Sequence, residues 1–432
     1  MEVLDYLIDS YGRFKRLLVK PCGGVKGEVS ISGAKNSALP LLAASLLVED
    51  LTLENFPFLL DTLYGLKILK LLGKEVELFP DRKRVRIYGG ITSTRVPWEL
   101  ASLFRGSILF LGGLLGAVGK TIVPPPGGCP IGSRPIDQHL KFVEHLGGEI
   151  GFEGGYISVK LRAPASRGDF TFDLITVTGT ENALLTLAGI EGEHTLRNVA
   201  LEPEVLDLVN FLREVGINVE TYGRTMKMEV PPKGELKKKL TYRVIPDRIE
   251  AGTFLVLGGL LGEPLRVKNL NVDHLRAVIE KLTQSGVRVN ILSPSEVEVF
   301  RAETLRGIDI ETAPYPGFPT DMQAQFMAML SVAEGDSVIV ERIFENRFKH
   351  AFELQKMGAN IAVRGNTALI EGVESLKGAN VKATDLRASA SLVIAGLIAK
   401  GETVIENIGH LLRGYEDMDK KLQRLGCEVV LL

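Results

Sequence analysis

The sequence predicts an α/β protein built from six copies of one unit. Apolar strand-like runs alternate with amphipathic helical runs, a helix-ending glycine recurs about every 70 residues, and most units begin with a glycine-containing turn. The chain has 432 residues, more than one hydrophobic core usually serves. We therefore expect two large domains of three units each.

The unit endings are the clearest part of the repeat. In each, a glycine follows apolar residues spaced by three and four, as in Val205–Val215, and precedes a short β-rich run. This pattern predicts a helix that stops at a glycine in the left-handed conformation and is followed by a strand. The six endings are Leu72–Val76, Leu146–Ile150, Val215–Val219, Ser285–Val289, Met357–Ile361 and Leu425–Val429.

The beginnings of the units and one linker suggest the domain boundaries. Turns at Gly192, Gly335 and Gly401 each lead into a β-rich run. The Pro- and Lys-rich stretch Pro231–Lys239 is the expected boundary between the first three units and the last three. We expect one domain of residues 34–243 and a second of residues 1–33 plus 244–432. The sequence leaves open whether the strand ending near Ser32 pairs with the second domain.

The overall composition excludes several classes of partner. Lys plus Arg (51) nearly balance Asp plus Glu (53), which argues against a nucleic-acid or acidic-membrane surface. The apolar stretch 108–118 is too short to span a bilayer, and we expect no targeting segment. Cys22, Cys129 and Cys427 are an odd number, so we expect reduced thiols and a cytoplasmic protein.

The segment Val123–Asp137 departs from the repeat because a Pro- and Gly-rich loop replaces a plain connection. It carries Cys129 and Arg134. Glycines allow a ligand to approach the backbone closely, and a nearby guanidinium favours a thiolate and binds phosphate or carboxylate. The alternative is a rigid surface turn with an incidental thiol.

A second candidate anion site lies at Ser32–Pro40, where Gly33, Lys35 and Asn36 precede an apolar helix. The free N–H groups of a helix start and the charge of Lys35 suit a phosphate or carboxylate. The spacing is not that of a Walker A loop. The alternative is an ordinary helix start with a solvated lysine.

Arginines recur at helix starts in the second half of the chain, at Arg347, Arg387 and Arg413. If the units are related by pseudo-symmetry, these guanidinium groups converge at one end of the domain and form an anion clamp. The alternative is surface salt bridging with the acidic residues beside them, Glu345, Asp385 and Glu416.

The Pro-stiffened stretch Pro314–Gln325 places a carboxylate, Asp321, at a helix start. Asp321 is either a helix cap or a general base that faces a cleft. Thr178–Asn182 and Pro246–Glu250 are further polar helix starts that could line the same cleft. The histidines show no metal-ligand spacing and there is no GxGxxG fingerprint, so we expect no metal and no cofactor.

Eight segments in order resemble the signature segments of the UDP-N-acetylglucosamine 1-carboxyvinyltransferases, a family of enolpyruvyl transferases. The resemblance runs from about Val19 to the C-terminus. It implies two similar domains, each of three βαβαββ-like repeats arranged as an inside-out α/β barrel. The segments are SGAKNSALP, PPGGCPIGSRPID, TGTEN, PDRIEAGTF, FPTDMQAQF, FENRF, ATDLRASASL and RGYE.

The resemblance also implies a reaction, in which the 3′-hydroxyl of UDP-N-acetylglucosamine attacks C2 of phosphoenolpyruvate and phosphate leaves from a tetrahedral intermediate. This is the first committed step of peptidoglycan synthesis. Asp321 would be the base and Cys129 the acid toward C3, which can also add covalently. Phosphoenolpyruvate would be held by Lys35, Arg134 and Arg413, with Arg347 and Arg387 completing the positive field. UDP-sugar contacts would come from Asn36, Arg105, Arg134, Pro135, Ile136, Asp137, Gln138, Asp321 and Ile343.

Some positions depart from the family pattern. Leu412 stands where an acidic residue usually precedes the last arginine. Leu174 and Ile175 stand where a lysine is common, which leaves uridine contacts at Thr176–Thr178 open. The first dozen or so residues extend beyond the usual start. We expect a monomer with no nucleic-acid or membrane partner.

Two other functions are alternatives to this one. 5-Enolpyruvylshikimate-3-phosphate synthase shares the implied fold. After the first strand, however, its family resembles the motif SGSKS rather than SGAKN, and it lacks the Cys loop. A non-catalytic UDP-sugar sensor on the same scaffold would bind the ligand without releasing phosphate.

Overall fold

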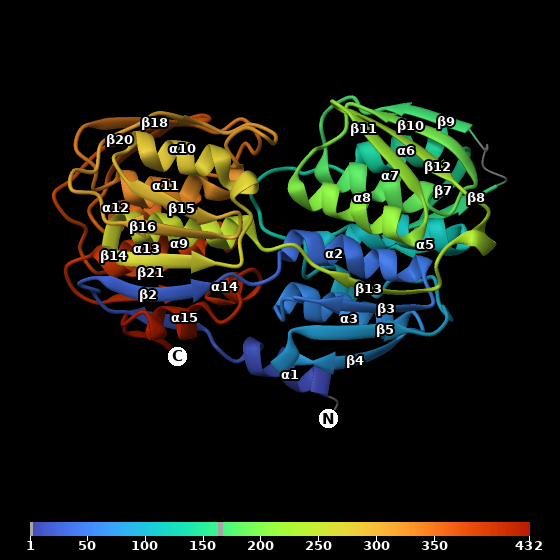
Figure 1. Cartoon of the computed structure of the whole chain (residues 1–432), viewed down its shortest axis with the longest axis horizontal. Helices are drawn as coiled ribbons and strands as arrows, with labels where there is room; N and C mark the ends of the chain where they lie inside the picture. Colours follow the sequence, from blue (N-terminus) through green and yellow to red (C-terminus); the bar gives the residue numbers. More distant parts are fainter. Residues whose placement is uncertain (1–2, 163–166) are drawn as a thin grey trace. The chain divides into compact units, whose positions relative to one another are not determined.

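A computed structural model describes residues 3–162 and 167–432. The chain divides into two compact units (Figure 1). Unit 1 holds the residues up to Asp5 together with Gly33–Gly128 and Pro135–Ile245. Unit 2 holds Tyr6–Ser32, Cys129–Arg134 and Pro246–Leu432. In the described residues no helix is both long enough and apolar enough to cross a membrane.

The described strands form six sheets, one for each predicted repeat, and none of these sheets closes on itself. Each four-stranded sheet contains one parallel pair followed by two antiparallel pairs, which is the pairing of a βαβαββ unit. The three-stranded sheet keeps the parallel contact only as a bridge between Arg95 and Ile122. The six-fold α/β repeat predicted from the sequence is therefore confirmed.

The sheets of unit 1 are β13-β3-β5-β4, β6-β8-β7 and β11-β12-β10-β9. Their strands are β3 (Asp50–Glu54), β4 (Glu75–Phe79), β5 (Arg84–Tyr88), β6 (Lys120–Val123), β7 (Gly148–Glu153), β8 (Tyr156–Leu161), β9 (Arg167–Thr171), β10 (Gly192–Arg197), β11 (Asn218–Tyr222), β12 (Thr225–Val230) and β13 (Lys239–Arg243).

The sheets of unit 2 are β15-β16-β14-β2, β17-β18-β20-β19 and β21-β22-β1-β23. Their strands are β1 (Arg16–Val19), β2 (Val25–Ser30), β14 (Gly262–Lys268), β15 (Arg288–Ser293), β16 (Glu296–Phe300), β17 (Ile310–Glu311), β18 (Asp336–Val340), β19 (Asn360–Arg364), β20 (Thr367–Glu371), β21 (Asn380–Lys382), β22 (Thr403–Glu406) and β23 (Val429–Leu431).

The N-terminal segment belongs to two different sheets of unit 2. Strand β1 lies between β22 and β23, and β2 pairs in parallel with β14. The question that the sequence left open is thereby answered, because the strand ending at Ser30 completes a repeat of unit 2. Likewise β13, which precedes the crossing at Ile245, completes the first repeat of unit 1 through β3.

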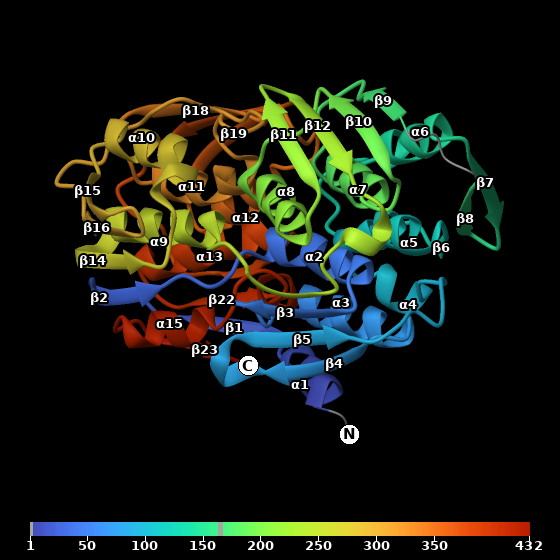
Figure 2. The ribbon, with the colours of Figure 1, turned by 45° about the vertical axis from the view of Figure 1, so that its right-hand side comes forward.

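Two kinds of helix fill each unit (Figures 1 and 2). The inner helices are buried along nearly their whole length and contact one another, so apolar residues occur on all of their sides. They are α2 (Lys35–Ala44), α5 (Leu109–Val118) and α7 (Val177–Leu187) in unit 1, and α9 (Arg248–Leu261), α11 (Gln323–Leu330) and α13 (Leu386–Ile398) in unit 2.

The second helix of each repeat buries only one side and ends at a repeat glycine. All six of these glycines have φ between +74° and +111°, which confirms the predicted left-handed helix stops. These helices are α3 (Leu60–Leu71), α6 (Asp137–His145), α8 (Pro203–Val215), α10 (Arg276–Gln284), α12 (Lys349–Lys356) and α15 (Met418–Arg424). The remaining helices are α1 (Val3–Gly12), α4 (Trp98–Ala101) and α14 (Gly409–Leu412).

The expectation of three reduced thiols is wrong, because Cys22 and Cys427 form a disulfide 405 residues apart in sequence. Cys22 follows β1 and Cys427 precedes β23, and the pairing of these two strands brings their Cα atoms to 5.3 Å. Sequence spacing could not reveal a pair that depends on the N-terminal strand returning to the last repeat. Cys129 is a free cysteine.

Candidate active site

The loop that carries Cys129 is anchored at both of its sides. Before Cys129, an added Cβ at Gly127 would lie 1.7 Å from the Ser102 carbonyl oxygen, and Gly128 has φ of +120°. Only glycine fits this close approach and this backbone conformation. Both glycines belong to unit 1, so they fix the loop to that unit up to Cys129.

Residues Cys129–Arg134 instead belong to unit 2, which differs from the domain boundaries expected from the sequence, where the whole loop lies in the first domain. Ser133 N donates to Glu345 Oε1 at 2.7 Å, and Lys349 Nζ donates to the Pro130 carbonyl at 2.9 Å. Asn346 N donates to the Ile131 carbonyl at 3.1 Å. No sequence pattern predicts these long-range hydrogen bonds.

The thiol of Cys129 has a polarised environment. Arg413 donates to Sγ at 3.5 Å, and His410 Nδ1 lies 3.9 Å from it. Burial alone would raise the pKa of Cys129, but the His410 contact, the charge of Arg413 and a bond from the Leu386 N–H together lower it to about 7. In a substantial fraction of the molecules, the Cys129 side chain is therefore a thiolate at neutral pH. The reading as an incidental surface thiol does not fit these contacts.

Sequence reasoning missed His410. It is the second residue of the short helix α14, and Arg413 is the C-cap residue of that helix, so the two residues are three apart and lie on one side of the turn. That H-x-x-R spacing was the only available signal, and it acquires meaning only once the Cys129 loop is known to lie on this turn.

Asp321 is held between two buried arginines. Arg347 donates to Oδ1 at 2.7 Å and Arg387 donates to Oδ2 at 3.1 Å. The exposed fractions are 25% for the Asp321 side chain, 7% for Arg347 and 3% for Arg387. Neither the 3₁₀ turn Thr320–Met322 nor α11 has a side-chain cap, so the alternative of Asp321 as a helix cap is not what the structure shows.

The acidic neighbours of the three arginines have other partners. Asp385 caps α13 by accepting from the backbone N–H groups of Arg387 and Ala388, each at 3.0 Å. Glu345 accepts from Ser133 N, and Glu416 accepts from Ser32 Oγ at 2.6 Å. Two of the three arginines, Arg347 and Arg387, meet at Asp321.

Arg134 lies in the same group of charges. Burial lowers its pKa, and the nearby charges of Arg347 and Arg413 lower it further, while Cys129 and Asp321 oppose that effect. Its guanidinium lies 5.4 Å from the centre of the Phe344 ring. Unit 2 thus gathers Cys129, Arg134, Asp321, Arg347, Arg387 and Arg413, a cationic cluster around one thiol and one carboxylate.

Lys35 begins α2 in unit 1, and Asn36 follows it in the first turn. Lys35 Nζ lies 3.2 Å from Asp61 Oδ2, and the side chains are only 11% and 2% exposed. The lysine is thus a buried, paired cation, in contrast to the solvated lysine of the alternative interpretation. Pairing of this kind fixes the position of a charge that would otherwise be mobile.

The remaining predicted contacts of unit 1 follow the loop into α6. Arg105 NH2 donates to the Pro135 carbonyl at 3.2 Å. Gln138 is 3% exposed and accepts from Asp173 N at 3.0 Å, while Asp137 is exposed. Ile136 is the N-cap residue, directly before α6. These contacts join the loop end to the segment that follows β9.

The polar starts of α7 and α9 have structural roles. Thr176 caps α7 through Gly179 N, and Asn182 Oδ1 accepts from Gly112 N of α5 at 2.6 Å. Asp247 caps α9, and Glu250 is paired with Lys421. Thr178 Oγ1 lies 3.1 Å from His139 Nε2, so the stretch where uridine contacts were left open contains a side chain already engaged.

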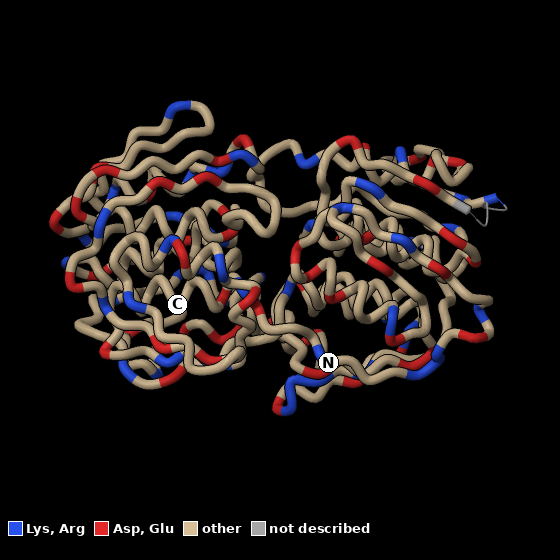
Figure 3. Tube along the Cα trace, turned by 45° about the horizontal axis from the view of Figure 1, so that its top comes forward, with Lys and Arg blue, Asp and Glu red and all other residues tan. Residues whose placement is uncertain are grey.

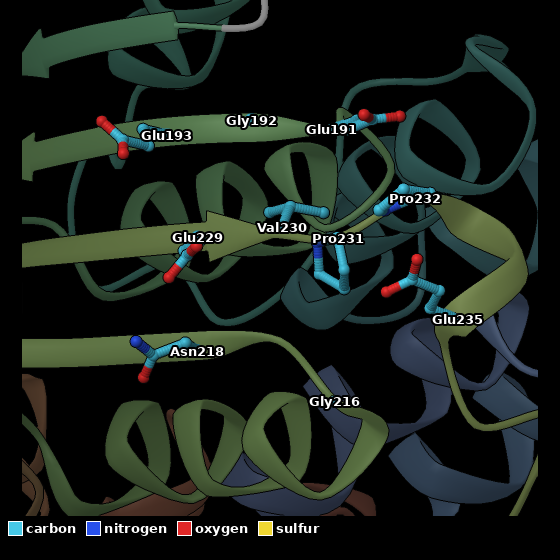
Figure 4. A pocket seen from close by; sticks show the side chains of 10 residues that line it. All are labelled: Glu191, Gly192, Glu193, Gly216, Asn218, Glu229, Val230, Pro231, Pro232 and Glu235. Carbon is cyan, nitrogen blue, oxygen red and sulfur yellow. The ribbon is translucent and has the colours of Figure 1, made fainter.

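A separate hollow of about 460 Å³ lies in unit 1 between the ends of β10, β11 and β12 (Figure 4). Glu191, Glu193, Glu229 and Glu235 line it, so it would repel anions. Elsewhere Lys and Arg are interspersed with Asp and Glu along the chain (Figure 3). Among the described residues no group of three or more His, Cys, Asp or Glu is placed to hold a metal ion.

The sequence is similar to curated enzymes over almost its whole length. It is 46% identical to the UDP-N-acetylglucosamine 1-carboxyvinyltransferase of Thermodesulfovibrio yellowstonii, covering 94% of this chain and 96% of that one. It is 44% identical to UDP-N-acetylglucosamine 1-carboxyvinyltransferase 1 of Caldanaerobacter subterraneus subsp. tengcongensis, covering 96% and 99%. This likeness confirms the resemblance drawn from the eight motifs.

Solved structures give the same result for the fold. The enolpyruvyl transferase NikO from Streptomyces tendae has a TM-score of 0.87 at 25% identity, covering 97% of this chain and 99% of NikO. EPSP synthase from Acinetobacter baumannii has a TM-score of 0.76 at 18% identity, covering 97% and 100%. The family described as EPSP synthase (3-phosphoshikimate 1-carboxyvinyltransferase) matches residues 19–422. The chain therefore belongs to this family of enolpyruvyl transferases.

Proposed function

We propose that the protein transfers the enolpyruvyl group of phosphoenolpyruvate to the 3′-hydroxyl of UDP-N-acetylglucosamine and releases phosphate. The observation that carries the proposal is the Cys129 thiol, held by His410 and Arg413 beside the arginines that bind Asp321. Curated relatives at 44% and 46% identity bear the name of this activity.

The proposed chemistry is an addition followed by an elimination. In the addition, the sugar oxygen bonds to C2 of phosphoenolpyruvate, Asp321 accepts the hydroxyl proton, and the Cys129 thiol gives a proton to C3. In the elimination, the C3 proton returns to the thiolate, the C–O bond to phosphate breaks, and the proton on Asp321 leaves with the phosphate. A thiol with a pKa of about 7 suits both directions of proton transfer.

The arginines serve the anions of this reaction. Phosphoenolpyruvate brings a phosphate and a carboxylate, and the intermediate keeps both on one carbon. Fixed guanidinium groups such as Arg134 and Arg413 stabilise that charge because they need no reorganisation during the reaction. Addition of the Cys129 S–H across the C2=C3 bond, with sulfur bonding to C2 and the proton going to C3, would give the covalent adduct that the resemblance implies.

The proposal also assigns further substrate contacts. Lys35 supplies charge toward phosphoenolpyruvate, and Arg347 and Arg387 complete the positive field. The UDP-sugar is contacted by Asn36, Arg105, Pro135–Gln138, Asp321 and Ile343. The support for these roles is the resemblance to the family, within whose motifs all of these residues lie except Arg105, Gln138 and Ile343.

Phosphate release tests the reaction and separates the alternatives. We expect phosphoenolpyruvate to release phosphate with UDP-N-acetylglucosamine as acceptor and not with shikimate 3-phosphate. A sensor would bind the UDP-sugar without releasing phosphate, and a shikimate enzyme would show the opposite preference. Either result would contradict the proposal. Omission of the acceptor is the control.

Fosfomycin tests the role of Cys129. This epoxide should alkylate the thiol and inactivate the protein, with a mass increase confined to the peptide that contains Cys129. A Cys129→Asp variant keeps an acid at this position, so we expect it to retain turnover and to resist inactivation. Equal inactivation of the variant and the wild type would refute the assignment.

The same proposal places the enzyme at the first committed step of peptidoglycan synthesis, as a cytoplasmic monomer. The activity named for its relatives supports this placement. Depletion of the protein in its host should cause accumulation of UDP-N-acetylglucosamine and lysis, and fractionation should recover it with the cytoplasm. Sedimentation of the purified protein measures its oligomeric state.

A further inference from the structure

Glu341 is a buried acid that none of the roles above uses. It follows β18 directly and is 2% exposed. Its carboxylate accepts four hydrogen bonds, from Thr312 Oγ1, Thr320 Oγ1 and the backbone N–H groups of Ile343 and Phe344. A carboxylate out of water requires such partners, because an unsatisfied buried charge is strongly destabilising.

One carboxylate oxygen of Glu341 acts on the residue next to Asp321. Thr320 Oγ1 donates to Glu341 Oε2 at 2.8 Å. An ionised carboxylate can only accept, so the single hydroxyl proton of Thr320 is committed to Glu341. The Thr320 oxygen is then left to accept from Arg347 NH1, also at 2.8 Å.

This chain of bonds fixes both sides of the Arg347 guanidinium. NH1 is held by Thr320, and NH2 donates to Asp321 Oδ1 at 2.7 Å. Because the guanidinium is planar and rigid, fixing NH1 also fixes the direction from which NH2 meets Asp321. Glu341 therefore sets the orientation of Asp321 through two intermediate groups, without touching it in any hydrogen bond described above.

The other oxygen of Glu341 shapes the loop after β18. Oε1 accepts from Ile343 N at 2.8 Å and from Phe344 N at 3.2 Å. Ile343 is a proposed UDP-sugar contact, and the Phe344 ring lies 5.4 Å from the Arg134 guanidinium and 5.3 Å from that of Arg347. One carboxylate thus supports both the proposed base and the loop proposed to bind the acceptor.

We propose that Glu341 is a positioning residue that aligns Asp321 for proton transfer through Thr320 and Arg347, and aligns the Ile343 loop for the UDP-sugar. The inference rests on the proposed function. It differs from a purely structural role in what it predicts, because a residue that only stabilises the fold changes the amount of folded enzyme and leaves kcat and KM per active molecule unaltered.

Glu341→Gln tests both arms of the proposal. The amide nitrogen cannot accept the Thr320 hydroxyl proton. The donor-to-acceptor sequence of the hydrogen-bond chain is therefore lost, while the shape of the side chain is kept. Measured per folded molecule, kcat should fall about tenfold to a hundredfold, since a displacement of about 1 Å can have that effect. KM for UDP-N-acetylglucosamine should rise severalfold through the Ile343 loop.

Glu353→Gln is the matched control. Glu353 is also a largely buried acid of unit 2, 9% exposed, and accepts from Lys382 N at 2.9 Å and from Lys356. It has no bond to Thr320 or to the Ile343 loop among those described. The control should lower the melting temperature without altering kcat or KM by more than about twofold.

Thr320 variants isolate one arm and remain informative if Glu341→Gln folds poorly. Thr320→Ser keeps the hydroxyl and should stay within about threefold of the wild-type kcat, whereas Thr320→Val should lower kcat at least tenfold with KM for the UDP-sugar little changed. In the double variant Glu341→Gln/Thr320→Val, the two effects on kcat should be clearly less than multiplicative, because both act through one chain.

Three results would overturn the inference. They are wild-type kinetics for Glu341→Gln, equal kcat for Thr320→Ser and Thr320→Val, and multiplicative effects in the double variant. Each of them leaves the proposed function standing if the wild type turns over UDP-N-acetylglucosamine. Absence of turnover by the wild type would overturn the proposed function and this inference together.

Discussion

Helices α7 and α13 occupy the same place in their repeats, yet the buried ionisable side chain at the start of each helix has a different set of partners. Each is the first helix of the last repeat of its unit. In α7, Glu181 is 2% exposed and its Oε1 has no hydrogen-bond partner among the described residues. In α13, Arg387 is equally buried but bonds to Asp321, and it also interacts with Tyr415.

The electrostatics of the two helices follow from their partners. Burial raises the pKa of Glu181 well above its ordinary value, and Glu204 and Glu202 raise it further, so the neutral form is favoured. The pKa of Arg387 is raised despite burial, because Tyr415 and Asp321 lie against it, so it stays charged. At α7 the surroundings therefore favour the neutral form of a buried acid, whereas at α13 they favour the charged form of a buried arginine.

The difference indicates which of the two helix starts has the features of an anion-binding site. A neutral buried acid is an ordinary packing solution, whereas paired buried ions beside a polarised thiol are typical of sites that bind anions. Three changes test this comparison.

Asp321→Asn should have the largest effect. It removes the negative charge between Arg347 and Arg387, and breaking a buried ion pair lowers the free energy of unfolding by about 3 kcal/mol. If Asp321 is the base, kcat should also fall by at least about 10²-fold. Chemical denaturation and phosphate release measure the two effects.

Asp309→Asn is the control for this change. Asp309 is exposed in unit 2, and its side chain accepts from Val338 N at 3.0 Å. It should leave kcat unaltered. A kcat for Asp321→Asn within about threefold of the wild type would remove Asp321 from the proposed reaction.

His410→Ala should have an intermediate effect, on the pH dependence of thiol reactivity. The wild-type rate of alkylation by iodoacetamide should rise with pH through a midpoint of about 7, as the thiolate forms. Loss of the His410 contact raises the pKa of Cys129, so the midpoint should move upward. At pH 6 the rate should fall about threefold or more. An unmoved midpoint would show that Arg413 and the Leu386 N–H suffice.

Glu181→Gln should have the smallest effect, and its sign depends on pH. A group whose folded pKa is raised contributes stability below its unfolded pKa, and that stability is lost as pH rises toward the folded pKa. The wild type and the variant should therefore melt alike near pH 4. The variant should melt higher at pH 8, by about 2 °C.

Glu193→Gln, on the exposed surface of the same unit, should show no such trend between pH 4 and pH 8. A Glu181→Gln variant that melts lower than the wild type at pH 8 would mean that Glu181 is ionised and paired. In that case α7 and α13 would not differ as described.

The sequence by itself determined the repeat and the residues that recur in it. Helix-ending glycines, turn glycines and alternating apolar runs are local features, because they depend on backbone conformation and on which face of one element is buried. Gly73 and Gly426 therefore had the predicted conformation without any knowledge of the tertiary structure. The eight motifs likewise named Cys129, Asp321 and the arginines in order.

Only the tertiary structure decided which of these residues meet. The disulfide of Cys22 with Cys427 and the contact of His410 with Cys129 join residues 405 and 281 positions apart, whereas the Glu341–Thr320–Arg347 chain joins three connecting segments of one repeat. Such contacts depend on how strands pair and how loops pack in three dimensions. Spacing along the chain carries no information about which side chains of these segments meet.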